Sequence, residues 1–392
     1  MISRSVQLLL GLVGVAVALP TRDNDIVPGK FIVTLQPDVG HELELHTRWV
    51  SEVHANNLRR RRSDSLGVEE TFDIPGFHAY AGSFDEATLE TIRANSSVLR
   101  VEPEKIVHIA AITTQANPPW GLSAISTSPP SPNSAYTYDS SAGEGTFSYI
   151  LDTGILLEHV EFQGRAVFGT NVHGSGSDRM HGTVVASVAG GVTFGVAKRT
   201  TLVDVQVLGS DSGTTTGIIR GLAWTRDDVL AKSRVGKSVV NMSLGGSNSP
   251  TLNNAVQTLI DAGIPVVVAS GNSFIDASDQ SPANQPNVIT VGATDRNWRR
   301  ASFSNYGSVV DVFAPGVGIQ VASSTSTTAT RLVDGTSEAS PHVAGLVAYL
   351  LGLEGLRTPA QIKTRVLELA TKDLIQDARG SGNFFVYNGI GN

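Results

Sequence analysis

Residues 238–270 read SVVNMSLGGSNSPTLNNAVQTLIDAGIPVVVAS, and this stretch decides the fold. It begins and ends with short apolar runs, SVVNMSL and IPVVVAS. Between them, SPTLNNAVQTLIDAG carries apolar residues three and four positions apart. Continuous apolar strands are typical of a parallel sheet covered on both faces, and the spacing between them predicts a helix. The stretch is therefore predicted to be a strand–helix–strand unit of an α/β domain.

The same pattern continues on both sides of this unit. Apolar runs that predict further strands are TFSYILD (146–152), TLVDVQVL (201–208), NVITVGA (287–293) and VVDVFAP (309–315). Helical spacing recurs in GIIRGLAWTRDDVL (217–230) and in ASPHVAGLVAYLLGL (339–353). We therefore predict that residues 113–392 form one α/β domain, a parallel sheet flanked by helices.

A second, smaller α+β domain is predicted for residues 19–112. Strand-like runs are predicted at residues 27–35, 76–85 and 98–109, with helices running to Asn57 and over EATLETIRAN (86–95). Residues 113–134 are rich in Pro, Ser, Thr and Asn, which favours a linker or an ordered but irregular surface segment. We place the domain boundary at the start of this segment.

The first residues predict export from the cell. Arg4 precedes an apolar run from Leu8 to Ala18, which ends in the small-residue pattern of a signal peptide at residues 1–18. The alternative is an N-terminal membrane anchor, but the run is shorter than the roughly 20 residues that a spanning helix needs. The four arginines Arg59–Arg62 have two interpretations, a solvated loop, which we favour, or a recognition site for a processing protease.

Composition excludes several classes of protein. The 392 residues include no cysteine, so cysteine catalysis and cysteine metal sites are impossible, and an exported chain must be stabilised by a large core or by bound metal. The 29 basic and 36 acidic side chains give a net charge of −7, without the basic excess of a nucleic-acid-binding protein. No later segment is apolar and long enough to predict a membrane span.

Three polar groups stand at the ends of predicted elements. They are Asp152 after a strand, His181 before a helical stretch, and Ser337 before the long apolar helix. A serine is a weak nucleophile unless an imidazole takes its proton, and a carboxylate must orient that imidazole. Each residue alone also has a structural interpretation, as a turn residue, a hydrogen-bonded histidine or a helix N-cap.

The motifs around these residues resemble those of the subtilisin-like serine proteases (peptidase S8 family), in the proteinase K-like branch of fungi. They are LDTGI (151–155), HGTVVA (181–186) and GTSEASPHVAG (335–345), and the Asp, His, Ser order is that of subtilisin itself. The first domain resembles the inhibitor I9-type propeptide of the same family, through VPGKFIVTL, YAGSFD and RVEPE.

The resemblance implies a role for each group of a catalytic site. Asp152 would orient the imidazole, His181 would act as general base and then as general acid, and Ser337 would be the nucleophile. The amide of Asn272, in VVVASGNS, would stabilise the oxyanion together with the backbone N–H of Ser337. The function implied is that of a secreted serine endopeptidase that is made as an autoprocessed zymogen.

The resemblance also implies where a peptide substrate would bind. The small, uncharged walls of the side-chain pocket suggest a broad preference for apolar side chains, and a third run would pair with an extended peptide. The residues expected to bind substrate are Ser212, Gly213, Thr214, Ser243, Leu244, Gly245, Ala269, Ser270 and Gly271.

One structural calcium site is implied, and no catalytic cofactor. Asp311 would bind Ca²⁺ together with the backbone carbonyls of Pro286 and Val288, oxygen donors that suit this ion. The alternative is that Asp311 only begins or caps a strand.

The sequence departs from the family near the triad. Met180, Val184 and Ser187 stand where the family has glycine, histidine and glycine, and Glu338 replaces the methionine after the nucleophile. The alternatives are therefore a catalytically impaired binding or regulatory protein on this fold, or a hydrolase for one small peptide or ester. We expect a monomer whose partners are peptide or protein substrates and its own propeptide, with no nucleic acid and no membrane, secreted rather than vacuolar.

Overall fold

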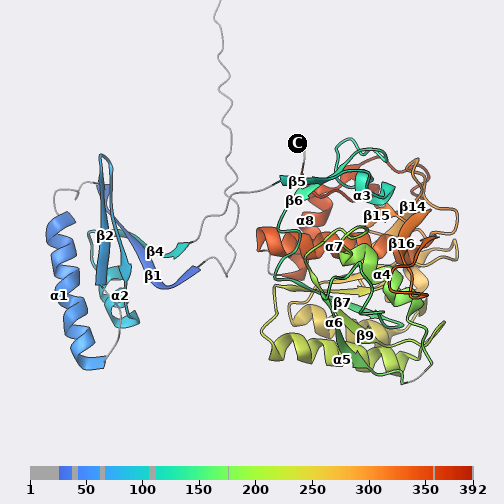
Figure 1. Cartoon of the computed structure of the whole chain (residues 1–392), viewed down its shortest axis with the longest axis horizontal. Coiled ribbons are helices and arrows are strands. Elements are labelled where there is room, and N and C mark those ends of the chain that lie inside the picture. The colour runs from blue at the N-terminus through green and yellow to red at the C-terminus, as the bar shows by residue number, and fades with distance from the viewer. Residues whose placement is uncertain are drawn as a thin grey trace, which may run out of the picture.

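The computed structural model describes residues 26–37, 43–61, 67–105, 112–174, 176–355 and 358–390. These residues form a small N-terminal unit and a large α/β domain (Figure 1). The predicted signal peptide, residues 1–18, lies outside the described residues. Within them, no helix combines the length and the apolar character that crossing a bilayer requires.

The N-terminal unit is a four-stranded antiparallel sheet with two helices packed against it. Its elements are β1 (Ile26–Leu35), α1 (Leu43–Arg61), β2 (Gly67–Ile74), β3 (Phe77–Ser83), α2 (Glu86–Arg93) and β4 (Val98–Lys105), in the sheet order β2-β3-β1-β4. Val33, Val50, Tyr80 and Ile92 are fully buried in its core. The prediction of an α+β unit is confirmed.

Two details of this unit differ from the sequence predictions. Strand β2 was not predicted, because its charged residues hide the alternation and most of its side chains are exposed or half-exposed. The arginine run is not a loop, since residues 59–61 complete α1 and only Arg62 lies outside the described residues. A charge run alone does not reveal that the helix continues through it.

A nine-stranded sheet forms the centre of the large domain, in the order β18-β19-β15-β14-β12-β10-β7-β9-β8. All neighbouring strands are parallel except β18 and β19. The strands are β7 (Phe147–Asp152), β8 (Ala166–Asn171), β9 (Thr201–Gln206), β10 (Ser238–Met242), β12 (Val266–Ala269), β14 (Ile289–Thr294), β15 (Val312–Pro315), β18 (Thr371–Lys372) and β19 (Phe384–Phe385). Every residue of β10, β12, β14 and β15 is buried, as their apolar sequences predict.

Helices cover both faces of this sheet (Figure 1). On one face α4 (Met180–Gly190) packs against α7 (Thr336–Glu354), with α8 (Pro359–Leu369) beside α7. On the other face lie α5 (Thr215–Ala231) and α6 (Pro250–Asp261). The chain turns from one side of β7 to the other when it passes from β9 to β10, and such a switch point is where α/β sheets bind ligands, at the carboxyl ends of the strands.

The segment after residue 112 belongs to the large domain. Strand β5 (Ile112–Gln115) pairs with β6 (Tyr136–Asp139), and α3 (Trp120–Ala124) is buried throughout. A Cβ atom at Gly121 would lie 2.6 Å from Nε2 of the buried His342 on α7, so only glycine fits there. The segment is therefore ordered, and it is more deeply buried than its polar composition predicts.

Candidate active site

The first predicted pair of the site is Asp152 and His181. Asp152 ends β7 and is fully buried, and its Oδ1 accepts a hydrogen bond from the backbone N–H of Thr153 over 2.7 Å. His181 lies in the first turn of α4 and donates from Nδ1 to both carboxylate oxygens, at 2.8 and 2.9 Å. The Asp152 charge raises the pKa of His181 to about 9, against the opposing effect of burial. This bond also leaves Nε2 as the nitrogen available for chemistry.

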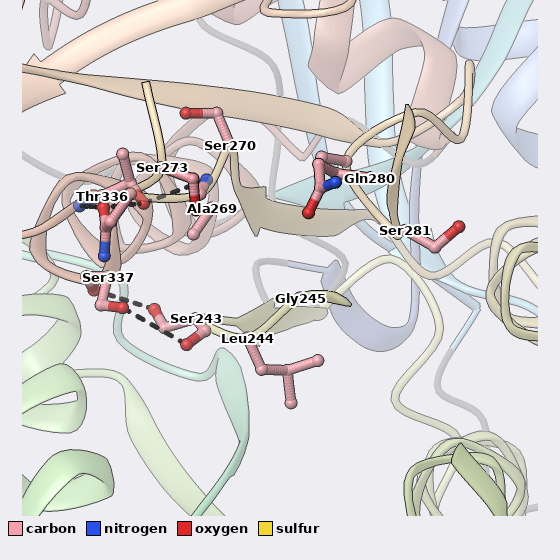
Figure 2. Close-up of a pocket in the computed structure, with 13 residues that line it drawn as sticks. Ser243, Leu244, Gly245, Ala269, Ser270, Ser273, Gln280, Ser281, Thr336 and Ser337 are labelled. Atoms are coloured by element: carbon pink, nitrogen blue, oxygen red, sulfur yellow. Dashed lines mark hydrogen bonds between the residues drawn. The ribbon is translucent and has the colours of Figure 1, made fainter. Parts of the chain in front are cut away.

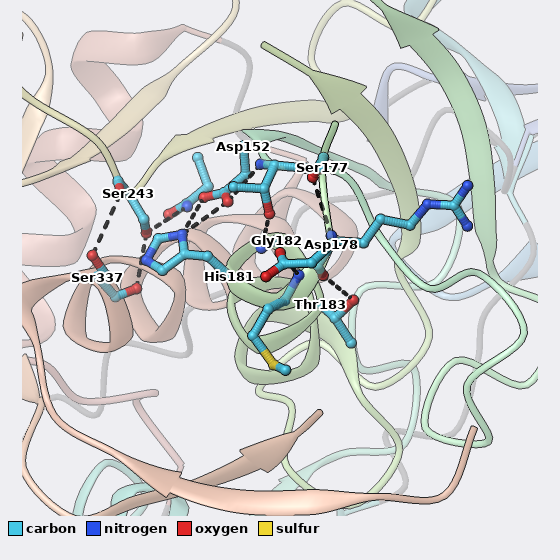
Figure 3. A network of polar contacts seen from close by, with 12 residues as sticks. Asp152, Ser177, Asp178, His181, Gly182, Thr183, Ser243 and Ser337 are labelled. Carbon is cyan, nitrogen blue, oxygen red and sulfur yellow. Dashed lines mark hydrogen bonds and ion pairs between the residues drawn. The ribbon is translucent and has the colours of Figure 1, made fainter. Parts of the chain in front are cut away.

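Ser337 lies on the other side of the His181 ring (Figure 3). It stands at the start of α7, where backbone N–H groups have no partner within the helix. Its hydroxyl donates to the carbonyl oxygen of Ser243 over 3.4 Å, and the hydroxyl of Ser243 donates back to the Ser337 carbonyl oxygen over 2.8 Å. A long hydrogen bond of this kind is weak and is easily exchanged for a better acceptor.

A chain of buried polar side chains supports the segment that carries the serine, and no motif predicted it. Ser340 Oγ donates to Asn241 Oδ1 over 2.8 Å, and Asn241 Nδ2 donates to Ser243 Oγ over 3.0 Å. Asn241 and Ser340 are both buried. The chain links the start of α7 to the end of β10, so the position of Ser337 relative to the sheet is held by side chains on two elements.

Asn272, the predicted oxyanion residue, follows β12 and reaches the same place. Its Oδ1 accepts from both the backbone N–H and the hydroxyl of Thr336, at 2.9 and 2.8 Å. Because Oδ1 is held by these two donors, the orientation of the amide is set and Nδ2 remains the donor for another group.

Both predicted pocket walls meet beside Ser337 in a cavity of about 260 Å³ (Figure 2). The segments at the carboxyl ends of β10 and β12 both line it, since neighbouring parallel strands end side by side. Its lining includes Ser243, Leu244, Gly245, Ala269, Ser270, Gly271, Asn272 and Ser337. The sequence prediction missed Gln280, Ser281 and Ala283, which also line the cavity because β13 (Gln280–Ser281) pairs with β11 (Gly246–Ser247).

A family model described as the subtilase family matches residues 143–387, which is more than half of the chain. The chain belongs to the subtilase family. A model described as peptidase inhibitor I9 matches residues 30–110 of this subtilase. The two matched ranges agree with the resemblances noted in the two parts of the sequence.

Named relatives agree with this assignment. Alkaline protease 1 of Aspergillus clavatus is 47% identical over 399 residues, with 99% of each chain covered. Alkaline proteinase of Hapsidospora chrysogena is 44% identical over 403 residues, again with 99% of each covered. A solved structure, that of a cold-adapted subtilisin-like serine proteinase, superposes with a TM-score of 0.64 at 40% identity, covering 70% of this chain and 99% of that one. This subtilase is a serine-type endopeptidase with an I9 propeptide.

A second cleft of the subtilase, of about 400 Å³, holds two of the three predicted peptide-pairing residues. Ser212 and Gly213 line it together with His181 and the Ser243–Gly245 wall. Thr214 lies outside this lining and caps α5 instead, with its Oγ1 accepting from Gly217 N over 3.1 Å. The Ser243–Gly245 wall therefore lines both clefts, with Ser337 in the first and His181 in the second.

Glu338 is the most unusual residue of the site. Its side chain is buried, and burial raises its pKa to about 7. Oε2 would lie 2.5 Å from a Cβ atom at Gly335, and that same point is 3.6 Å from Nδ2 of Asn272. Among the described residues, Oε2 has no hydrogen-bond partner. The carboxyl therefore lies in the neighbourhood of Asn272, and the charge of His181 partly offsets the rise in its pKa.

The other three residues that differ from the family pattern are Met180, Val184 and Ser187, and each has partners in the surrounding structure. Met180 Sδ accepts from the hydroxyl of Ser323 over 3.5 Å, and Val184 is buried in the main core. Ser187 Oγ donates to the Val184 carbonyl and accepts from the N–H of Ala322, in β16 (Ile319–Ala322), which pairs with β17 (Thr330–Val333). Ser187 and Met180 thus connect α4 to β16 and the residue after it, and Val184 packs in the core.

The predicted calcium ligands meet, but they do not fit a calcium ion. The subtilisin-like fold commonly binds structural calcium. Here the Nζ of Lys363, on α8, donates to the carbonyl oxygens of Pro286 and Val288, and it contacts the carboxylate of Asp311 at 2.9 Å. The ammonium therefore occupies the position between the three predicted ligands. The calcium prediction took no account of Lys363, because the resemblance identified only the oxygen donors and not the lysine that reaches them.

Proposed function

We propose that Asp152, His181, Ser337 and Asn272 are the catalytic groups of this endopeptidase. The observation that carries the proposal is the double hydrogen bond from His181 Nδ1 to the buried Asp152 carboxylate, with Ser337 on the far side of the ring. A buried carboxylate that fixes the tautomer of an imidazole beside a serine is the arrangement that nucleophilic acyl transfer requires.

The reaction follows from these positions. Ser337 Oγ attacks the carbonyl carbon of the scissile peptide bond while its proton passes to Nε2 of His181. His181 then gives this proton to the leaving amine, and the C–N bond breaks to leave an acyl-enzyme. A water molecule, deprotonated by the same imidazole, hydrolyses the ester and returns the proton to Ser337. Because the base must be neutral and its pKa is raised to about 9, activity increases toward alkaline pH.

The negative charge of each tetrahedral intermediate falls on the former carbonyl oxygen. Nδ2 of Asn272 and the backbone N–H of Ser337 are the two donors that we assign to it. The hydrogen bonds from Thr336 hold the Asn272 amide before substrate arrives, so little reorganisation accompanies the reaction.

The substrate is proposed to be an extended peptide with an uncharged side chain before the scissile bond. The 260 Å³ cavity beside Ser337 has no charged residue in its lining, although its serines and Gln280 make it more polar than an aliphatic pocket. Ser212 and Gly213 are proposed to pair with the peptide backbone along the second cleft.

The chain is proposed to be exported by residues 1–18 and to mature by cleavage of its own chain near Thr113. Residues 19–112 contain the I9 match and would serve as folding aid and temporary inhibitor. Strand β5 begins at Ile112 and pairs with β6, so cleavage near this point would leave a paired strand at the new N-terminus.

The test is a fluorophosphonate label combined with N-terminal sequencing of the protein in the culture medium. Covalent labelling of Ser337, with a mature N-terminus near Thr113, is expected. An unlabelled serine would favour a binding protein on this fold. A labelled protein that cleaves only one small peptide or ester would favour a specialised hydrolase.

Replacement of Glu338 by methionine is expected to raise kcat at alkaline pH. Above its pKa of about 7 the carboxylate is negative, and it repels the developing oxyanion; below that pH it is neutral and the substitution changes kcat little. At an effective dielectric of about 20 the repulsion corresponds to a tenfold to roughly hundredfold loss of rate. The charge of Glu338 also raises the pKa of His181, so its removal shifts the acidic limb of the pH profile to lower pH.

The measurement is kcat on one peptide substrate from roughly pH 6 to 10, because this range includes the pKa values of both Glu338 and His181. Glu338→Gln is the matched control, since it removes the charge and keeps the shape. Both variants should exceed the parent at high pH, and only Glu338→Met should lose activity in peroxide. Equal or lower turnover in both variants at high pH would mean that the carboxylate does not oppose the reaction.

A further inference from the structure

The side chain of Lys363 ends among oxygen atoms from two other parts of the fold. Its Nζ lies 3.1 Å from the carbonyl oxygen of Pro286 and 2.8 Å from that of Val288. It also lies 2.9 Å from each carboxylate oxygen of Asp311. An ammonium has three N–H donors and no acceptor, so two carbonyls and one carboxylate satisfy it fully.

The ammonium and a calcium ion exclude one another at this place. Calcium binds oxygen at about 2.3–2.6 Å and takes six to eight oxygen ligands. An ion bound to the same carbonyls and carboxylate would coincide with Nζ, which already lies at hydrogen-bond distance from all of them. The lysine must leave before an ion can enter.

The contact joins three parts of the large domain. Lys363 lies in the middle of α8, Pro286 and Val288 lie in the segment before β14, and Asp311 directly precedes β15. Asp311 also fastens β14 to β15, because its Oδ2 accepts from Thr290 N and its own N–H donates to Thr290 O, each over 2.9 Å. The lysine therefore connects α8 to the amino ends of two inner strands of the central sheet, in a chain without cysteine.

Charge balance favours the same assignment. Both side chains of the pair are mostly buried, with 23% of Lys363 and 18% of Asp311 exposed. Burial raises the pKa of Asp311, while the lysine opposes that rise. A carboxylate in such surroundings requires a cation, and the structure supplies one from its own chain.

The chain contains a second example of this arrangement. Lys198 Nζ donates to the carbonyl oxygens of Val192 and Gly195, each over 3.0 Å, and it lies over the rings of Tyr136 and Tyr138. Backbone carbonyls that converge on one point are thus held by a lysine in two separate loops.

We propose that Lys363 supplies, as a cation attached to the chain, the cross-link that a structural calcium ion would supply between Asp311, Pro286 and Val288. The stability of the large domain then does not depend on free calcium at this place. The inference concerns folding only, and it holds whether or not Ser337 is the nucleophile.

The experiment measures the melting temperature in excess EDTA and in millimolar calcium. The purified protein is first treated with a serine-directed inhibitor so that self-digestion does not contribute. The parent and Lys363→Ala are each compared with the same protein carrying Asp311→Asn. Calcium can raise the melting temperature through several ions. Only the part of the rise that is lost in the Asp311→Asn protein is assigned to this place, so ions bound elsewhere do not count.

The parent is expected to show no calcium response that depends on Asp311. Lys363→Ala should melt about 5–10 °C lower in EDTA, because a buried carboxylate loses its partner, and calcium should restore part of this loss. Lys363→Met removes the charge but keeps an apolar side chain in the same space. Its melting temperature should also fall, and calcium should restore less of the loss than in Lys363→Ala. Lys372→Ala, at an exposed position in β18, is the control and should melt like the parent.

Two results would overturn the proposal. One is an Asp311-dependent calcium response in the parent, which would mean that calcium displaces the ammonium. The other is a Lys363→Ala protein that melts like the parent in EDTA and ignores calcium. If the Asp311→Asn proteins do not fold, equilibrium dialysis with radioactive calcium decides the question: Lys363→Ala should bind one more ion than the parent, and equal binding would contradict the proposal.

Discussion

A Ser337→Ala variant is expected to accumulate as a precursor that still carries residues 19–112 and to lose peptide hydrolysis. The proposed first cleavage uses the same serine as every later one, so removing Oγ stops both maturation and turnover. The expected fall in kcat is on the order of a millionfold, because the proposed acyl bond forms on Oγ of Ser337. Mass spectrometry of the secreted and retained protein, with a peptide assay, measures both effects.

Ser326→Ala is the matched control for this variant. Ser326 is an exposed serine between β16 and β17, so its replacement should leave maturation and activity as in the parent. Normal maturation of Ser337→Ala would show that another protease performs the first cleavage. The arginine run at residues 59–62 would then be the leading candidate for its recognition site.

An Asn272→Ala variant is expected to lose a factor of about 100 to 1,000 in kcat with little change in KM. The proposed role of Nδ2 begins when charge develops on the carbonyl oxygen, so binding of the uncleaved peptide should be largely preserved. The variant also leaves Thr336 without its acceptor, and a melting curve is needed to separate this structural effect.

Asn272→Asp completes the test of the oxyanion role. It keeps an acceptor for Thr336 but offers no donor, so it should fold and still be slow. Asn297→Ala, in an exposed turn, should behave as the parent. A large rise in KM with unchanged kcat in Asn272→Ala would contradict the assignment, since it would mean that the amide holds the substrate and not the oxyanion.

The central sheet was predictable because its strands are buried on both faces. β10, β12 and β14 therefore appear as continuous apolar runs, and α6 appears between them with regular spacing. The segment around α3 was harder to predict, because its Pro, Ser and Thr content conceals how deeply Trp120 and Leu122 are buried. Their partners lie on elements far along the chain, which local composition does not report.

The residues of the candidate site could be predicted only where they belong to sequence motifs of the family. Asp152, His181 and Ser337 stand at element ends, and only the sequence around each one favoured a catalytic role over that of a cap. Lys363 carries no such sign, since a lysine in an amphipathic helix is ordinarily exposed. Only the packing of α8 beside the strands brings its ammonium to Asp311.

The order of the elements along the chain also determines when the proposed catalytic groups can come together during synthesis. Asp152 leaves the ribosome early, but Ser337 follows only after β15, β16 and β17, and the two are separated by well over half of residues 113–392. A parallel sheet assembled through such long connections folds slowly. A nascent chain that stops before α7 therefore has the proposed base without the proposed nucleophile, and we expect it to be inactive. If Ser337 is the nucleophile, proteolytic capacity arises only after α7 has been synthesised, when residues 26–105 have already been available to fold.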